Sequence, residues 1–387
     1  MGSLVFTFSS IILTSMVGLT AFQAGVVGFL YACSNVVGAI VGGKLADLYG
    51  RKRVYFSMTL VTCIFFLISS FFCTTIWIVP LSICAFFGSN ACYPIVSAMV
   101  ADVAGSGPKS AESFSLLYLC HNLGFAVGPA LGGALLANHL NIVYWIQAGM
   151  FMLGACILFF GTTDNYLAAQ APRKLEEKGK AKEDDYAVRV GTWTMLMQNK
   201  IIMVFTIVLA IATTAYAAIS FMLILQFKDM FGLAAAATYG GRIWTVNALV
   251  VVFGTPIIVK FTKTHHQFLC MTIGCILYCI GFGAYGYVDK IILFFVAVVI
   301  WSVGEILIST GAGVFIAENS PPSHVARFQS MYDMARSIGR GLGPLVFGSL
   351  VTVFTYQQTW KINAAACLAI AVVCWYIFGK EMKKKRG

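Results

Sequence analysis

Charged side chains interrupt the apolar stretches of the sequence at five positions, all in its second half: Arg242, Glu305, Asp333, Arg336 and Arg340. An ionised side chain inside a lipid bilayer costs at least about 2.5–3.5 kcal/mol, and such residues usually mark function. The spacing of Asp333, Arg336 and Arg340 puts them on one face of a helix. Glu305 and Arg340 lie at equal depth, which makes a Glu305–Arg340 or a Glu305–Arg336 ion pair feasible.

This cluster could carry protons and bind an anion. Because partial burial favours the neutral form of a carboxyl group, Glu305 is the best candidate to take up and release a proton. Arg336 and Arg340 can hold an anionic group of a substrate, or keep Glu305 ionised until a substrate displaces it. The alternative is a static ion-pair network that fixes two helices against each other.

An internal repeat extends this cluster into the first half of the chain. A shift of the numbering by 215 places four residues on four others: Gly124, Gly128, Pro129 and Gly133 fall on Gly339, Gly343, Pro344 and Gly348. The same shift places Glu305 on Asn90, Arg336 on His121 and Arg340 on Phe125. We expect one polar constellation where the halves meet, as in transporter folds built from repeats. His121 could titrate near neutral pH, or be an ordinary core histidine.

The elements that position these residues are predicted to be membrane-spanning helices. Of the 387 residues, 59% are hydrophobic and only 11% are charged, which is far fewer charges than a soluble domain carries. Backbone polar groups in hydrocarbon need internal partners, so long apolar runs must be helical. Twelve such runs occur, near residues 4–20, 21–43, 54–73, 77–101, 113–137, 143–162, 200–226, 234–259, 268–287, 291–317, 327–353 and 360–379.

A charged stretch divides these helices into six and six. We predict an N-terminal bundle at 1–163, a linker at 164–199, a C-terminal bundle at 200–379 and a basic tail at 380–387. Most of the 26 lysines and arginines fall on the side of the linker and tail. Because basic loops stay in the cytoplasm, the linker and C-terminus are predicted to be cytoplasmic. The protein itself is predicted to lie in the cell membrane.

The first apolar run is short, so either helix 1 is short or the chain start is missing; we favour a missing start.

The segment 43–53, which reads Gly-Lys-Leu-Ala-Asp-Leu-Tyr-Gly-Arg-Lys-Arg, joins the second and third predicted helices. It resembles the signature loop of the major facilitator superfamily, G-x-L-a-D-r-x-G-r-r/k. The resemblance implies an all-α membrane fold of two pseudo-symmetric six-helix bundles. It also implies a cytoplasmic gate with Asp47 and Arg51, in which Gly50 makes the tight turn and Asp102 is a plausible partner of Arg51. The alternative is a solvated loop that only sets topology.

The segment 124–133 looks like the helix 5 motif of the twelve-helix drug–proton antiporter branch of this family. Its small residues, Gly124, Gly128 and Gly132, permit close helix packing, and Pro129 permits a bend. The repeat gives Gly339, Gly343 and Pro344 the same part in the second half. A bendable, closely packed helix would suit rocking of the halves, although ordinary tight packing explains it equally well. One departure is Cys84, which stands where many proton-coupled members have arginine in an R-x-x-q-G pattern.

Taken together, the resemblance implies a secondary transporter that works by alternating access. We expect proton-coupled efflux of a small amphipathic or charged molecule; the alternatives are proton-coupled uptake of an anionic nutrient and a non-transporting receptor or scaffold on the same fold. The expected partners are a small-molecule substrate, protons and the lipid bilayer, with the protein acting as a monomer. We expect no enzyme activity, no cofactor, no metal and no nucleic acid, since the basic residues follow membrane topology. Tyr93, Tyr118, Tyr216 and Phe221 lie in helices that line cavities in this fold, and could contact substrate.

Overall fold

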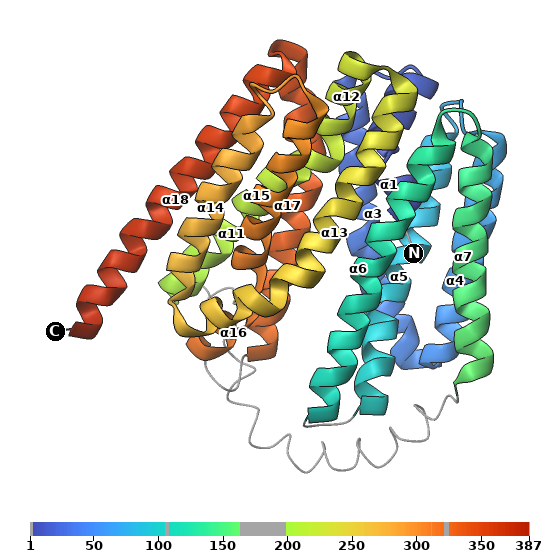
Figure 1. Cartoon of the computed structure of the whole chain (residues 1–387). Helices are drawn as coiled ribbons and strands as arrows, with labels where there is room; N and C mark the ends of the chain where they lie inside the picture. Colours follow the sequence, from blue (N-terminus) through green and yellow to red (C-terminus); the bar gives the residue numbers. More distant parts are fainter. Residues whose placement is uncertain (1–2, 105–107, 163–198, 311, 321–324, 387) are drawn as a thin grey trace, which may run out of the picture.

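The structure is a computed structural model that describes residues 3–104, 108–162, 199–310, 312–320 and 325–386. The described residues form helices joined by short turns (Figure 1). The predicted linker at 164–199 lies almost wholly outside the described residues. Below, the end of the molecule where α7 (Leu140–Gly161) ends and α11 (Lys200–Ala218) begins is called the linker end, and the opposite end is called the far end.

Twelve helical segments follow one another along the described chain, as the sequence predicts. The first half contains a broken first segment of α1 (Ser3–Phe6), α2 (Ser9–Ile11) and the π-helical η1 (Ile12–Met16), followed by α3 (Ala21–Tyr49), α4 (Arg51–Phe71), α5 (Ile78–Ala104), α6 (Pro108–Leu136) and α7 (Leu140–Gly161). The second half contains α11 (Lys200–Ala218), η2 (Ile219–Leu223) and α12 (Ile224–Phe231) as one span, then α13 (Leu233–Thr264), α14 (Gln267–Ala284), α15 (Ile291–Thr310) with α16 (Ala312–Asn319), α17 (Val325–Val353) and α18 (Tyr356–Arg386).

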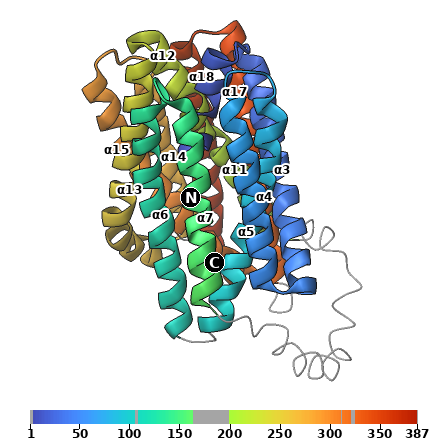
Figure 2. The same cartoon turned by 90° about the vertical axis from the view of Figure 1, so that its right-hand side faces the viewer.

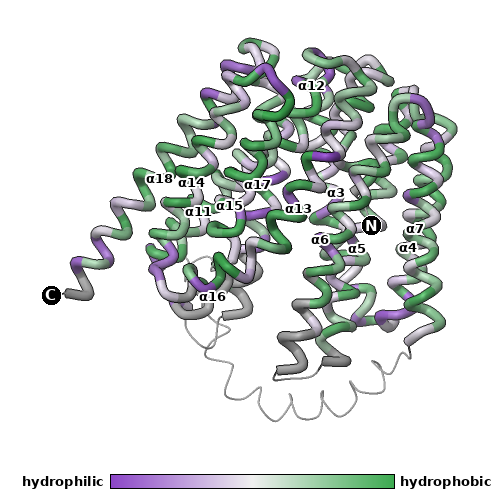
Figure 3. The backbone as a smooth tube through the Cα atoms, in the orientation of Figure 1, coloured by the Kyte–Doolittle hydropathy of each residue, from purple (hydrophilic) through white to green (hydrophobic). Residues whose placement is uncertain are grey.

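Ten helices among the described residues are long and apolar enough to cross a membrane. Two of the twelve segments are missing from this set for physical reasons. The first is interrupted and short, and α17 carries Asp333, Arg336 and Arg340. Hydrophobic residues run along the long helices, and hydrophilic ones gather mainly at their ends (Figure 3). The protein is therefore an all-helical, multi-pass membrane protein.

Local chemistry explains where several helices begin and turn. Thr20 and Gln23 form a reciprocal capping box at the start of α3. Gly50 lies between α3 and α4 with a φ of 95°, a conformation that glycine adopts without steric cost. The last helix differs from its predicted range, because α18 begins at Tyr356 and stays helical through the basic residues to Arg386. Its C-terminal end stands away from the bundle (Figure 1).

The two halves meet along two seams, α3 against α17 and α6 against α13. Glycines make both seams close. Gly341 lies against Ala32 on the first seam, and Gly133 lies against Ala237 on the second. In the described part of the chain, the glycine contacts between halves fall in the far-end portions of these four helices. Figure 2 shows the same bundle from the side of the first half.

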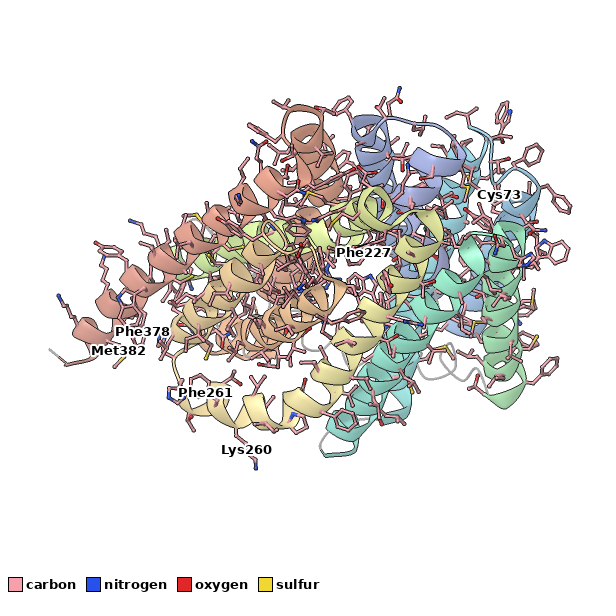
Figure 4. The ribbon with its side chains drawn as sticks, turned by 45° about the horizontal axis from the view of Figure 1, so that its top comes forward. Cys73, Phe227, Lys260, Phe261, Phe378 and Met382 are labelled. Atoms are coloured by element: carbon pink, nitrogen blue, oxygen red, sulfur yellow. The ribbon has the colours of Figure 1, made fainter. Side chains whose placement is uncertain are left out.

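Aromatic packing fills the interior of the second half. Phe227 is fully buried and its ring contacts Phe294 at 4.9 Å between centroids. Figure 4 shows Phe227 among the helices, whereas Lys260 projects from the linker end of α13. The interior is thus apolar, and the few polar side chains inside it need a specific explanation.

Candidate functional site

Glu305 lies on α15, inside the second half, and neutral groups hold its carboxylate. Asn247 of α13 donates a hydrogen bond from Nδ2 to Glu305 Oε2 at 2.9 Å. The same Asn247 amide donates to Ser302 Oγ at 2.9 Å, which fixes its orientation. Tyr216 of α11 is a further hydrogen-bonding neighbour of the carboxylate. Buried polar groups need such partners, and the sequence places Ser302 and Glu305 about one helical turn apart on α15.

The two arginines act on Glu305 from α17 without touching it. Both guanidinium groups are close enough for their charge to act on the carboxylate, Arg340 more strongly than Arg336. Arg336 donates to the Tyr332 hydroxyl at 3.3 Å and lies over that ring, 5.5 Å from its centroid. Within the described residues no ion pair joins Glu305 to either arginine. The feasible pair is therefore a through-space interaction, because Asn247 and Tyr216 occupy the carboxylate.

Arg340 lies on the interior side of α17. Successive residues of a helix are about 100° apart around its axis. Gly339 packs against α11, and Gly341 packs against α3 on the first half. Arg340 points between these two contacts, whereas Met334 and Ile338 occupy the opposite face, each 48% exposed. The exposed guanidinium of Arg340 consequently faces the space between the halves, and the apolar face turns to lipid.

An arc of aromatic rings crosses from the first half to the second beside Arg340. Tyr93 of α5 and His121 of α6 have ring centroids 5.9 Å apart, and His121 and Phe125 are 5.2 Å apart. Phe125 contacts Trp244 of α13 at 6.2 Å across the second seam. The ring centroids of Trp244 and Tyr216 are 6.3 Å apart, and Tyr216 is the residue that also hydrogen-bonds Glu305. Below, these five residues are called the aromatic arc.

The structure places the first-half counterparts of the cluster differently from one another. His121 is exposed and close enough to Arg340 to feel its charge, so it joins the charged site. Asn90 instead donates from Nδ2 to Asn35 Oδ1 at 2.6 Å and ties α5 to α3 within the first half. Asp333 lies within the electrostatic reach of Arg336. Arg242 lies on the side of α13 with the exposed Leu249 and Phe253, away from Asn247.

The signature loop anchors the linker end of the first half. Arg51 donates to the carbonyl oxygen of Ala98, near the end of α5. Lys52 donates to the carbonyl of Thr162 at 2.7 Å and lies 4.6 Å from the centroid of the Phe159 ring. Lys52 thus binds at the C-terminus of α7, where backbone carbonyls carry partial negative charge. Asp47 lies in the last turn of α3; the side chain of Asp102 lies outside the described residues.

The Gly and Pro residues of the repeat lie where helices approach closely. On α6, Gly132 faces Leu4 of the first segment, and the Pro129 carbonyl faces Gly241 of α13. On α17, Gly343 faces Ala217 of α11, and Pro344 lies against Gly28 of α3. Gly128 is buried in α6, and Gly124 is half-buried one turn before it. Pro129 and Pro344 thus stand at equivalent places on the two seams, as the repeat predicts.

Little or nothing in the sequence indicates that Tyr216 and Trp244 belong to the site. Tyr216 is one of three tyrosines that the sequence places in cavity-lining helices, and nothing in its spacing links it to Glu305. Trp244 carried no signal by itself, although its spacing of three residues from Asn247 puts both on one face of α13. In the part of the chain described, no group of three or more His, Cys, Asp or Glu side chains could hold a metal ion.

Comparison with known proteins agrees with this architecture. A family model described as Major Facilitator Superfamily matches residues 1–344 and 243–387. The uncharacterized MFS-type transporter YttB of Bacillus subtilis (strain 168) is 24% identical over 391 residues, covering 99% of this chain and 93% of YttB. The Na(+), Li(+), K(+)/H(+) antiporter of Planococcus maritimus is 21% identical, covering 84% of this chain and 81% of that protein. The crystal structure of the nucleoside transporter NupG matches with a TM-score of 0.78 at 16% identity, covering 97% of this chain and 95% of NupG.

Three independent observations now agree. The signature loop lies between the second and third helical segments, twelve segments form two bundles with equivalent seams, and the family model spans both bundles. The members of this family are transporters and not enzymes. The chain belongs to the Major Facilitator Superfamily of secondary transporters.

Proposed function

We propose that this protein is a proton-coupled secondary transporter in which Glu305 carries the proton. The observation that supports this proposal is the setting of the Glu305 carboxylate, which neutral donors hold while the cations stay at a distance. A carboxylate locked in a direct ion pair resists protonation, whereas one bonded to an amide and a phenol can gain a proton and keep these partners. The groups that face it are Asn247, Tyr216, Tyr278 and the two arginines of α17.

Alternating access would use the two seams. The far-end portions of the four seam helices are in close contact, and the exposed groups, Arg340 and His121, lie on the linker side of those contacts. This geometry supports a conformation that is closed at the far end and accessible from the linker end. In our proposal the halves rock about the seams, where Pro129 and Pro344 allow α6 and α17 to bend. Asp47, Arg51 and Asp102 would form the gate of the opposite conformation.

The proposed placement follows the distribution of basic residues. Bundles at 1–163 and 200–379 would be joined by a cytoplasmic linker at 164–199 and followed by a basic cytoplasmic tail at 380–387 in the cell membrane. The linker end then faces the cytoplasm. We propose a monomer as the working unit, since each chain contains both halves and the cluster between them.

The proposed direction is efflux of a small amphipathic or charged molecule in exchange for protons. Two observations support it: the helix 5 motif of the sequence, and the likeness to a cation/proton antiporter over most of the chain. The second candidate is proton-coupled uptake of an anionic nutrient. The observation in its favour is Arg340, an exposed cation between the halves.

The experiment uses everted membrane vesicles that contain the protein and a fluorescent dye that reports the proton gradient. Respiration acidifies the vesicles, and a panel is then added: Na⁺, K⁺, organic cations and organic anions. Exchange with protons restores the fluorescence. We expect a response to at least one panel member with the wild type and with Glu381→Gln, a matched control on α18 outside the cluster, and none with Glu305→Gln. A full response with Glu305→Gln contradicts the proposed role. A response only in right-side-out vesicles, as co-transport with protons, selects uptake.

A further inference from the structure

The hydrogen-bond partners of the site are unevenly distributed among its charged groups. Arg336 has Tyr332 as a hydrogen-bond partner and Asp333 as a charge partner. Glu305 is held by Asn247. Among the residues that the structure describes, the Arg340 guanidinium makes no hydrogen bond or ion pair with another residue, and its side chain is exposed. A guanidinium presents five donors in a fixed planar fork, and an unpaired cation at membrane depth is costly unless it lines a water-filled space or a binding site.

The exposure of Arg340 is toward the space between the halves. The helical positions on either side of it pack on α11 and α3, and its charge reaches His121 of α6 in the first half. The two rings that reach this space from the first half are accessible: Tyr93 is 60% exposed, and His121 is also exposed. Arg340 and the open end of the aromatic arc therefore bound the same space.

The remaining rings of the arc provide an apolar boundary, in which neighbouring rings are tilted by 49° to 67° to one another. Phe125 and Trp244 are 6.2 Å apart across the seam, and Trp244 is buried. Aromatic rings interact favourably with other rings in offset or edge-to-face arrangements. A cationic fork beside a row of rings matches a ligand with a planar ring system and one anionic group.

On this basis we propose that the substrate class is a planar organic anion: a carboxylate, sulfonate or phosphate ester on an aromatic ring, with the anionic group on Arg340 and the ring on the aromatic arc. This inference rests on the proposed transport function and narrows it. A cationic substrate fits less well, because Arg340 is exposed whereas Glu305 is half-buried and already bonded to Asn247.

The inference also bears on direction. Arg340 and Glu305 lie within electrostatic reach of each other, so protonation of Glu305 removes a negative charge near Arg340 and strengthens the binding of an anion there. The proton and the anion then occupy the protein together. Simultaneous binding of a proton and an anion is a requirement of co-transport, so a planar anion as substrate would support the second candidate, uptake, over the proposed efflux, and the vesicle experiment above decides between them.

The test measures binding to the purified full-length protein in lipid nanodiscs, by calorimetry and by quenching of tryptophan fluorescence. The probes are 2-naphthoate, its saturated analogue decalin-2-carboxylate, 2-naphthylmethylammonium and inorganic phosphate. We expect 2-naphthoate to bind most tightly. Arg340→Gln should weaken that binding about 10- to 100-fold, which is the usual worth of hydrogen bonds to a charged group. Arg242→Gln, which removes an arginine from the other face of α13, should leave it unchanged.

Two further variants separate recognition from folding. Phe125→Leu should weaken 2-naphthoate more than decalin-2-carboxylate, and Arg340→Lys should restore part of the affinity lost in Arg340→Gln. The proposal is overturned if the ammonium probe or phosphate binds best, if no aromatic anion binds, or if Arg340→Gln binds 2-naphthoate like the wild type while eluting as a folded monodisperse protein. Failure of the proton role would appear separately, as coupled transport retained in Glu305→Gln.

Discussion

The closed seam at the far end can be opened by adding one methyl group. Gly348 of α17 lies against the start of α3, and a Cβ atom there would stand 2.7 Å from the carbonyl oxygen of Ala21 and 3.1 Å from Cα of Gly25. Ordinary Cβ contacts begin at 3.4 Å. Both neighbours are backbone atoms and cannot rotate away. Gly348→Ala therefore requires α17 and α3 to separate by about 0.7 Å at this end, relative to the ordinary contact distance.

The size of the effect follows from the cost of overpacking. Extra methyl groups in well-packed interiors cost about 1–3 kcal/mol, and here only the conformation closed at the far end bears that cost. The equilibrium between conformations should shift about 5- to 150-fold toward opening at the far end. The gain in helix propensity from glycine to alanine, about 0.5–1 kcal/mol, is common to both conformations and cancels.

The assay is a distance measurement between spin labels at the far end. Labels at Asn138→Cys in the first half and Val353→Cys in the second are placed in a background that lacks the other accessible cysteines. We expect Gly348→Ala to populate a longer distance than the wild type shows. Gly149→Ala on α7 is the matched control, because a Cβ there meets nothing within 4 Å. The reasoning is refuted if both alanine variants give the wild-type distribution.

Three further predictions concern single side chains. Asn247→Leu removes the amide donor that holds Glu305, and we expect proton-coupled transport in vesicles to fall about tenfold or more; wild-type transport would contradict this. Gln226→Leu leaves the buried Trp360 indole without the acceptor that it reaches at 2.6 Å, at a cost of about 1–3 kcal/mol; an unchanged melting temperature in detergent argues against that network. Lys52→Met removes a cation from the C-terminus of α7, and we expect a smaller loss of about 0.5–2 kcal/mol, read from the same melt.

The sequence predicted the helices well because the composition of each apolar run shows that lipid surrounds it. Long apolar runs can only be helices in lipid, so the order of segments and the two equivalent halves follow from composition and repeat. The breaks within segments could not be predicted in the same way. The π-helical turns η1 and η2 each lie in the first segment of their half and have no recognisable sequence signature.

The sequence predicted which residues belong to the site better than it predicted the contacts between them. Charge inside an apolar run identifies Glu305, Arg336 and Arg340 as unusual, but equal depth on neighbouring helices cannot say which atoms meet. In the structure Glu305 accepts a hydrogen bond from Asn247, and Arg340 is exposed. It also shows that Asn90, which the repeat places on Glu305, donates a hydrogen bond to Asn35 of α3. Side-chain direction around each helix decides these contacts, and that direction depends on tertiary packing.

The central claim, that Glu305 gains and loses the transported proton, is tested most directly by infrared difference spectroscopy of the protein in lipid during a pH jump. A protonated buried carboxyl group gives a carbonyl stretching band that is separate from the bands of ionised carboxylates. We predict that this band appears on acidification of the wild type and of Glu381→Gln, and is missing in Glu305→Gln. A band that survives unchanged in Glu305→Gln would assign the proton to another group and contradict the account.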